Sequence, residues 1–544
     1  MILNNEGAIP RMIQKRTTTM ISQSISADSA RDVKKVAKGA GISFVGSATG
    51  RGLSILCQII IARSFGTEVF GLYTLGLVVL RITEIVARFG LDTGAMRFVS
   101  MSQKDNAGKV KGIFISASFI SFINGIVIGG IVYYFAGFVS EAIFHKSELT
   151  DVIKTFAICI PFMTTMMVIA GASQGFQTTK YSVYTKDIIR PSANMVFLIP
   201  FILFHFGIFG VIYAFVISHA IALLAGFYFI SRQFPEIKGK IVKPVYEIKM
   251  LLKYSAPLLL SGFLSFLILW TDTIMLGFMK TTKEVGIYRA ASQIPIFLTL
   301  VLMASNSIYA PAIAEMHYLG QRERLGKIFK TTTRWIFLLS LPIALIIIFS
   351  AREIMAFFGS DYIEAGVPVI IVLVIAQFIN CATGGVGYTL VMTGKQHVEM
   401  LNTLATVIIN IALNYFLIPT YGSLGSAVAT GISVGGVNLV RLLEVYFLCK
   451  IQPYNMGYIQ GVVCGAIAGI ALYLLDNHVL IDDYLLINNY FLNHPIFVRL
   501  VSNSFVVSGI FVVGFIIKGI TDEDRFILSA IKGKLKVKIS ESGF

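Results

Sequence analysis

Fourteen long apolar stretches, separated by short polar segments, most constrain what this chain can fold into. Each has roughly the 20 residues that a helix needs to cross the hydrocarbon core of a bilayer. Their limits are 41–62, 70–91, 112–135, 153–173, 185–205, 208–230, 252–279, 287–314, 333–351, 365–392, 398–419, 424–448, 457–475 and 499–519. Strands of membrane barrels alternate in polarity over about 10 residues and do not give such runs. The sequence therefore predicts an all-α polytopic membrane protein with about 14 transmembrane helices.

The charge content agrees with a membrane protein and predicts its orientation. Only 14% of the 544 residues are charged, against about 25% in a soluble domain. This composition argues against a soluble enzyme or a nucleic-acid-binding protein, although the net charge is +16. If the N-terminus is cytoplasmic, the inner segments hold 33 of the 45 Lys and Arg residues, the outer loops 8 and the spans 4. The positive-inside rule thus predicts a multi-pass protein of the cell membrane with both termini in the cytoplasm.

An internal repeat divides the chain into two halves. Gly71 in TEVFGLY and Gly286 in KEVGIY are 215 residues apart, and Gly207 and Gly422 have the same offset. Each repeat holds six spans, so we expect two lobes of like orientation around a central cleft, which is the architecture of an alternating-access transporter. The expected domains are a cytoplasmic tail with a short amphipathic helix (1–39), an N-lobe (40–231), a cytoplasmic linker (232–251), a C-lobe (252–450), two added spans (451–520) and a basic cytoplasmic tail (521–544).

Arginines inside the spans are the main candidates for a binding site. A charged side chain at the bilayer centre costs roughly 2.5–3.5 kcal/mol, so it must face a wet cavity or a partner. Arg51 lies between two glycines near the centre of the first span, and Arg81, Glu84 and Arg88 share one face of the second. Arginine suits phosphate because its fork donates two parallel hydrogen bonds. We expect Arg51, Arg81 and Arg88 to bind a phosphate group; the alternative is a structural network that holds helices together.

Other ionisable residues in the spans are weaker candidates. Glu84 and Asp272 could exchange H⁺ or Na⁺, or could form hydrogen bonds between packed helices. Arg441 and Glu444 form an i, i+3 pair in the twelfth span, but Arg441 can reach the inner surface. Arg289, at the outer mouth of the eighth span, could be only a surface charge. The five cysteines form no CxxC pair and the seven histidines have no metal-ligand spacing, so we expect no metal, cofactor or catalytic residue.

Two segments of the first half resemble the polysaccharide transporter family, whose pattern runs approximately ARxLGxxxYGxY and then FGLDxxxxRF. They are ARSFGTEVFGLY at 62–73 and RFGLDTGAMRFV at 88–99, with Phe70 where a Tyr is common. DTIMLG at 272–277, followed by EVGIYRAA at 284–291, looks like the counterpart in the second half. The resemblance covers roughly residues 30–530.

Members of this family are flippases of the multidrug/oligosaccharidyl-lipid/polysaccharide superfamily. The resemblance implies a V-shaped pair of six-helix lobes with basic cavity residues in the N-lobe. It also implies a polyprenyl- or dolichyl-linked (pyro)phosphate oligosaccharide as substrate, moved to the outer leaflet for surface polysaccharide or glycoprotein synthesis. The tail TDED at 521–524 is similar to those of archaeal members. Expected partners are this substrate, membrane lipid, H⁺ or Na⁺ as coupling ion and glycan-assembly enzymes, with no nucleic acid.

Two other functions stay open on the sequence alone. A cation-coupled multidrug exporter of the same superfamily would need an anionic cavity, whereas the spans hold four arginines and few carboxylates. A membrane glycosyltransferase or polymerase would need loops with paired carboxylates for acid–base chemistry, and no loop presents them. The sequence therefore favours a transporter that makes and breaks no bond. It does not identify the glycan, nor whether translation starts at Met1 or Met20.

Overall fold

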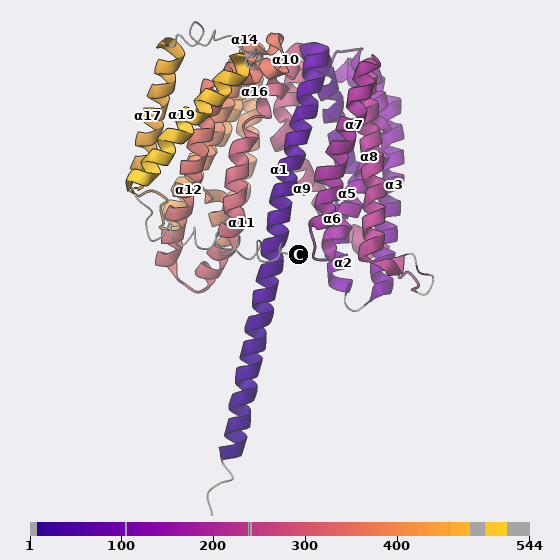
Figure 1. Ribbon diagram of the computed structural model, residues 1–544. Helices are drawn as coiled ribbons and strands as arrows, with labels where there is room; N and C mark the ends of the chain where they lie inside the picture. Colours follow the sequence, from indigo (N-terminus) through magenta and orange to yellow (C-terminus); the bar gives the residue numbers. More distant parts are fainter. Residues whose placement is uncertain are drawn as a thin grey trace, which may run out of the picture.

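The computed structural model describes residues 8–103, 106–237, 239, 242–455, 457–478 and 495–518, and before residue 41 only the course of the backbone. All regular elements in these ranges are helical (Figure 1), which confirms the predicted all-α class. The first half contains α1 (Ala8–Arg88), α2 (Leu91–Ser102), α3 (Ala107–Phe138), η1 (Val139–Ile143), α4 (Leu149–Ala157), α5 (Ile160–Gly175), α6 (Lys180–Val183), η2 (Tyr184–Ile189), α7 (Arg190–Leu203), α8 (Gly207–Gln233) and η3 (Pro235–Ile237).

The second half and the added helices follow the linker. They are α9 (Ile248–Met279), α10 (Thr282–Ser292), α11 (Ile296–Tyr318), α12 (Arg322–Phe349), α13 (Ala351–Phe358), η4 (Ser360–Tyr362), α14 (Ile363–Thr383), α15 (Val386–Met392), α16 (Gln396–Glu444), η5 (Val445–Cys449), α17 (Gly457–His478) and α19 (Pro495–Lys518). The predicted tail at 521–544 lies outside the described residues, as does Met1. The short helix predicted within 1–39 is part of α1, which already begins at Ala8.

Single glycines break the two longest helices. Gly66 interrupts α1 with φ 76° and ψ −178°, and Gly422 interrupts α16 with φ 56° and ψ −131°. Both conformations lie at positive φ, which glycine adopts readily because it has no Cβ. Each of these two helices therefore contains two of the predicted spans.

Eight helices among the described residues are long and apolar enough to cross a membrane, or ten if each bent pair forms one span. The bent pairs are α4 with α5, at 45°, and α10 with α11, at 42°. Pro161 and Pro295 stand at these two bends, because proline lacks the N–H that would continue a helix. The total of fourteen spans stays a prediction.

The two halves lie side by side, with α1 in front of them in the view of Figure 1. The largest buried apolar cluster takes residues from both halves, among them Phe70, Leu75, Phe156, Val285, Tyr288 and Tyr362. A second cluster, built on Leu91, Phe98 and Ile113, belongs mainly to the first half, and a third, built on Tyr309 and Phe329, to the second. The core is thus shared mainly in the first cluster, and α9 of the second half also contributes Leu251 to the second cluster.

Repeat-related residues form that shared junction. A Cβ on Gly71 would collide with the carbonyl group of Thr282, and a Cβ on Gly286 would collide with that of Thr67. Thr67 and Thr282 are themselves 215 residues apart, so the two contacts are equivalent by the internal repeat. Gly207 and Gly422, the other repeat-related pair, both have positive φ, at 62° and 56°. The structure therefore supports the repeat deduced from the sequence.

The halves also touch through α2 and α9. A Cβ on Gly90 would lie 2.5 Å from the carbonyl oxygen of Ser255, and a Cβ on Gly94 would collide with the Ser255 hydroxyl. Beside them, Arg97 donates a hydrogen bond to the hydroxyl of Tyr254 at 3.3 Å and lies over its ring. Small residues let these two helices approach closely, as is usual between membrane helices.

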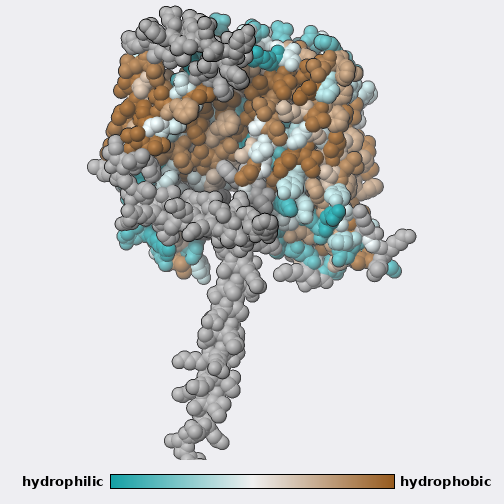
Figure 2. Space-filling model, viewed as in Figure 1, coloured by the Kyte–Doolittle hydropathy of each residue, from teal (hydrophilic) through white to brown (hydrophobic). Residues whose placement is uncertain are grey.

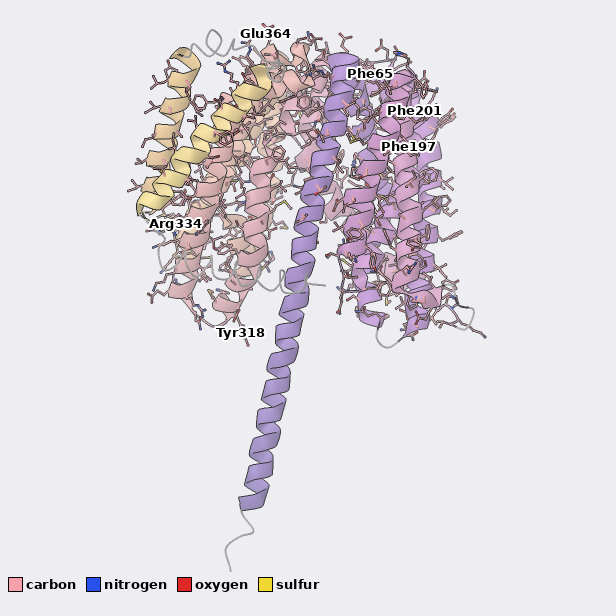
Figure 3. The ribbon with its side chains drawn as sticks, viewed as in Figure 1. Phe65, Phe197, Phe201, Tyr318, Arg334 and Glu364 are labelled. Carbon is pink, nitrogen blue, oxygen red and sulfur yellow. The ribbon has the colours of Figure 1, made fainter. Side chains whose placement is uncertain are left out.

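The surface has the polarity expected of a membrane protein. Hydrophobic residues fill the middle of the face shown in Figure 2, and hydrophilic residues gather at its upper and lower ends. Large apolar side chains such as Leu203 and Leu269 are 70% and 73% exposed, which is unfavourable in water over so wide an area. Tyr318, at the end of α11, and Glu364, at the start of α14, lie at opposite ends of the bundle (Figure 3). The chain between them crosses its full thickness through α12.

Candidate functional site

Arg51 lies on α1 where the first half faces the second. Its two terminal nitrogens are each 3.9 Å from the sulfur of Met303 on α11. Gly50 packs so tightly on η2 that a Cβ would collide with the backbone of Asp187, whereas Gly52 faces open space. The two glycines that flank Arg51 therefore differ, because only Gly50 allows another helix to approach closely. Arg51 forms no ion pair among the described residues.

Arg81, Arg190 and Arg289 form a group of cations, here called the arginine group. Both Arg190 and Arg289 are repelled by Arg81, and Arg190 is also attracted by Asp187. Arg289 stacks on the Trp270 ring at 4.6 Å, and its Nε atom is buried without a hydrogen-bond partner. Within the described part of the chain, none of the three has a carboxylate within 4.0 Å. The arrangement offers several unused donors to an anion.

Arg190 was missed by the sequence reasoning. The charge count placed it with the inner loops, because Asp187 and Lys186 precede it within a short polar run. In the structure it begins α7, where it is close enough to be repelled by Arg81 of α1. Its position inside the fifth apolar stretch, 185–205, was the available signal. Arg289, predicted only as a weaker candidate, is a member of the same group.

The predicted face of Arg81, Glu84 and Arg88 separates into two parts. Arg88 pairs with Glu84 at 3.2 Å and with Asp92 at 3.1 Å, so two carboxylates neutralise it. Glu84 is 3% exposed. Arg88 and Asp92 line a small cavity of about 170 Å³ between the end of α1, the start of α2 and the middle of α9. Of the two arginines, only Arg81 has no carboxylate within 4.0 Å among the residues that the structure describes, although Glu84 still attracts it electrostatically.

Asp272 is the centre of a polar network in the second half. Its carboxylate accepts hydrogen bonds from Tyr288 at 2.5 Å, Asn410 at 3.1 Å, Asn414 at 2.7 Å and Thr430 at 2.6 Å. All four donors are neutral, and the carboxylate has no basic partner within 4.0 Å among the described residues. The Oδ1 atom of Asn414 is buried without a partner. The sequence singled out Asp272, but not the two asparagines and the threonine that α16 brings to it.

Arg441 and Glu444 do not pair with each other. Arg441 binds Glu399 through two nitrogens, at 2.9 Å and 2.5 Å, and Glu444 accepts a hydrogen bond from Asn402 at 2.5 Å. Both partners come from the first part of α16, which lies before the break at Gly422 and packs against the second part. The i, i+3 pair expected from the sequence is therefore replaced by two contacts across the hairpin.

Comparison with known proteins gives the family. Residues 36–317 match the family model described as "Polysaccharide biosynthesis protein", and residues 257–416 match the MatE model. A protein of Shigella flexneri assigned as an O-antigen transporter is 23% identical over 386 residues, which are 69% of this chain and 89% of the relative. The probable flippase AglR of Haloferax volcanii is 27% identical over 219 residues, which are 38% of this chain and 44% of the relative.

Solved structures of similar fold agree with this match. The lipid II flippase MurJ in an inward closed conformation has a TM-score of 0.65 at 14% identity. The match covers 86% of this chain and 97% of MurJ. An inward-facing multidrug transporter of the MATE family has a TM-score of 0.53 at 15% identity, covering 77% of this chain and 99% of the other. These structures have the V-shaped two-lobe fold that the resemblance implied. Since the first family model spans more than half of the chain, the protein belongs to the polysaccharide biosynthesis protein family.

Proposed function

We propose that this protein is a flippase that moves a polyprenyl- or dolichyl-linked (pyro)phosphate oligosaccharide across the cell membrane. The observation that carries the proposal is the arginine group, whose members come from both halves and have no carboxylate partner. Family membership and the transporters among the relatives support it. The glycan would serve surface polysaccharide or glycoprotein synthesis, with glycan-assembly enzymes supplying the substrate.

The arginines would bind the phosphate of the lipid-linked sugar. Uncompensated cations repel one another, and each costs roughly 2.5–3.5 kcal/mol at mid-membrane on insertion scales. A doubly charged anion placed between Arg81 and Arg289 removes that repulsion and gains charge-assisted hydrogen bonds. Arg51, which faces the second half at Met303, would extend the site along α1. Phosphate binding thus joins groups from both halves around one ligand.

Arg88 and Arg441 fit a structural role better. Each already has a carboxylate within hydrogen-bond distance, so binding phosphate would first require breaking an ion pair. We therefore propose that Arg88 stabilises the junction of α1 and α2, and that Arg441, with Glu444 nearby, stabilises the α16 hairpin.

Movement of the two halves would carry the substrate across. We propose residues 40–231 and 252–450 as the rocking lobes, with both termini in the cytoplasm. The halves meet at the Gly71–Thr282 junction and again through Gly90 and Ser255, and alternating access would loosen these contacts in turn. The sugar and phosphates would pass between the lobes while the lipid chain stays in the bilayer. No covalent bond is made or broken in this cycle.

Asp272 is proposed as the coupling site for H⁺ or Na⁺. The Asp272 carboxylate is bound only by neutral donors, so it has no basic side chain that a coupling cation would have to displace. Rotation of the Asn410 or Asn414 amide would turn an oxygen towards a bound Na⁺, and Asn414 already has an oxygen without a partner. Hard cations such as Na⁺ prefer oxygen ligands of these kinds. A proton would instead convert the carboxylate into a donor.

The multidrug exporter remains the second candidate because the MatE model also matches. An exporter of cationic drugs needs an anionic cavity, and the unpaired groups between the halves are cations. The structure from Pyrococcus furiosus, described as a superfamily transporter with a binding pocket of reversed polarity, shows that the fold occurs with such a difference. The cationic group therefore favours an anionic substrate.

Arg51→Gln tests the flippase in proteoliposomes that contain a fluorescent polyprenyl-pyrophosphate oligosaccharide. We expect at least a tenfold slower flipping rate, because a phosphate hydrogen bond to a charged donor contributes about 1.5–3 kcal/mol. Arg63→Gln is the matched control, since Arg63 lies on the same helix but is exposed, and its flipping rate should not change. Undiminished flipping by Arg51→Gln would remove this residue from the site. Export of a cationic dye without flipping by the wild type would favour the exporter.

A further inference from the structure

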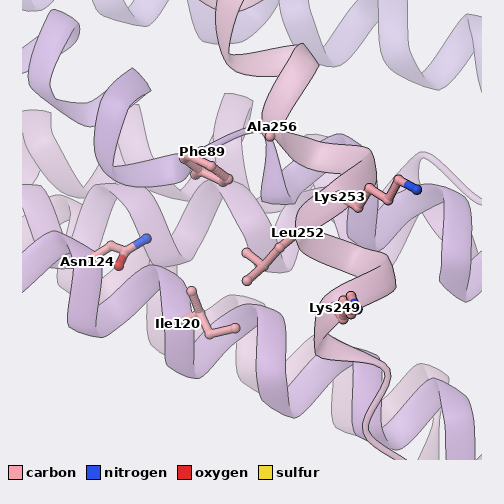
Figure 4. Close-up of a pocket in the computed structure, with 7 residues that line it drawn as sticks. All are labelled: Phe89, Ile120, Asn124, Lys249, Leu252, Lys253 and Ala256. Atoms are coloured by element: carbon pink, nitrogen blue, oxygen red, sulfur yellow. The ribbon is translucent and has the colours of Figure 1, made fainter.

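A groove opens on the side of the bundle where the two halves meet. Its volume is about 570 Å³, and it is lined by Phe89, Ile120, Asn124, Lys249, Leu252, Lys253 and Ala256 (Figure 4). Ile120 and Asn124 belong to α3 of the first half, and the last four residues to α9 of the second. We propose that this groove binds one anionic phospholipid of the surrounding membrane, with a hydrocarbon chain against the apolar walls and the phosphate at Lys249 and Lys253. The inference is independent of the transported substrate.

The walls of the groove suit a hydrocarbon chain. Phe89, Ile120 and Leu252 pack on the buried cluster of the first half, so the floor is apolar and fixed. On the same helix as Ile120, Phe119 and Ile123 are 65% and 40% exposed, and the groove therefore opens towards lipid. An empty apolar cavity loses dispersion contacts along its whole lining. In a bilayer, the material at hand to fill it is a lipid chain.

The turn before Gly90 shapes one wall. Phe89 has φ 53°, a left-handed conformation that is uncommon for residues other than glycine, and Gly90 follows at φ 70°. These two residues form the sharp turn that connects α1 to α2. Figure 4 shows the Phe89 ring at the groove, opposite the α9 residues. An unusual backbone conformation thus holds an apolar side chain at the site.

Two lysines give the groove its charge. Lys249 and Lys253 are exposed and one helical turn apart on α9, and neither forms an ion pair among the described residues. Glu247, the nearest carboxylate along the chain, is already bound by Lys109 at 2.6 Å. No carboxylate lines the groove. The site therefore presents two free positive charges above an apolar floor, which is complementary to an anionic lipid.

The depth of the lysines matches a lipid headgroup. α9 has 32 residues, which at 1.5 Å per residue gives about 48 Å, well beyond the roughly 30 Å hydrocarbon core. Its first turns, with Lys249 and Lys253, therefore lie at the level of the headgroups. Basic residues in this position attract anionic lipids, and each strengthens lipid binding by about fivefold.

Native mass spectrometry of the full chain in detergent micelles tests the site, with phosphatidylglycerol and phosphatidylcholine as probes. We expect the wild type to retain one phosphatidylglycerol in preference to phosphatidylcholine. The double variant Lys249→Gln, Lys253→Gln should retain phosphatidylglycerol about 25-fold more weakly, because each basic residue contributes about a fivefold effect. Lys327→Gln with Lys330→Gln removes two lysines from the first turns of α12 and is the matched control, which should retain the lipid as the wild type does.

Ala256→Trp separates the groove from the charges. Ala256 is exposed at the groove, so a tryptophan there fills the groove without touching the core and leaves both lysines in place. Loss of phosphatidylglycerol in this variant is expected. Unchanged retention in either groove variant, or equal retention of the two phospholipids by the wild type, would overturn the proposal. Retention of polyprenyl phosphate in place of phosphatidylglycerol would also overturn it, since the groove would then belong to the substrate.

Discussion

Charged side chains within the helices have different partners in the two halves of the molecule. In the first half, Arg51 and Arg81 lie within the helices without a carboxylate partner. In the second half, Asp272 accepts four hydrogen bonds and Arg441 binds Glu399 with two nitrogens. Asp272 and Arg441 of the second half are therefore bound by side chains of that half, whereas Arg51 and Arg81 of the first half have no carboxylate within 4.0 Å in the described part of the chain.

The difference teaches where a ligand is needed. A charge that is removed from water without a partner is unfavourable. An unpaired charge inside the bundle therefore indicates that a ligand supplies the opposite charge during transport. A charge that is already paired instead stabilises the fold, and breaking the pair lowers stability. Removing an unpaired charge should thus lower activity, whereas removing a paired charge should lower stability.

Arg81→Gln should give the largest effect. We expect about a 100-fold slower flipping rate, because two charge-assisted hydrogen bonds to phosphate are lost, while the melting temperature stays the same or rises. Arg88→Gln is the matched control on the same helix, and it should lower the melting temperature with a smaller change in flipping. Flipping measured in proteoliposomes and thermal unfolding measured by intrinsic fluorescence check both. The reverse pattern would break the comparison between paired and unpaired arginines.

Arg441→Gln should mainly affect stability. Breaking a buried ion pair costs about 3–5 kcal/mol, and we expect about 2 kcal/mol here because the two side chains are 17% and 19% exposed. Replacing both partners, with Arg441→Met and Glu399→Met, should recover part of this loss since no charge is left alone. Thermal unfolding of the wild type and the two variants measures the effect. A stable Arg441→Gln variant without transport would place Arg441 in the binding site instead.

Asp272→Asn should uncouple the ion from transport. We expect about a tenfold slower rate in a Na⁺ or pH gradient, from roughly 1.4 kcal/mol of lost interaction, and no response to reversing the gradient. The amide keeps the shape, and its single oxygen, placed where Oδ1 stands, can still accept the hydrogen bonds from Asn410 and Asn414. Flipping assays with imposed gradients give the measurement. A gradient response equal to that of the wild type would leave Asp272 as a packing residue.

Lys146→Met should give the smallest effect, at a contact between the halves. Lys146 donates to the carbonyl oxygens of Phe144 at 3.1 Å, Gly277 at 2.6 Å and Lys280 at 3.0 Å, and so ties the first half to the end of α9. We expect a loss of about 1 kcal/mol in the free energy of unfolding. Burial lowers the pKa of Lys146, so the folded protein releases this proton more readily than the unfolded chain. The free energy of unfolding of the wild type should therefore increase relative to that of the variant as the pH rises towards about 10. A difference that shrinks with rising pH would contradict this sign.

Much of the fold could be predicted from the sequence because membrane helices show in local composition. The apolar stretches gave the helical class, and the glycines repeated at an offset of 215 gave the two halves. The site was predicted less completely. Arg51 and Arg81 stand out because a charge in an apolar run is visible locally. Arg190 follows a polar run that is typical of a loop, and Asn410 and Asn414 carry no charge. Asparagine in a helix carries no signal until a carboxylate is placed beside it.

The sequence by itself determined which stretches are apolar enough to enter a membrane and which charges lie within those stretches. Only the tertiary structure decided which of those charges are compensated. Arg88 finds Glu84 and Asp92 a turn away on its own chain segment, but Arg441 is bound by Glu399, 42 residues earlier, and not by Glu444. Apolar burial depends on composition over many residues, which a sequence displays. An ion pair depends on a few ångströms between two atoms, which only the packing of the helices sets.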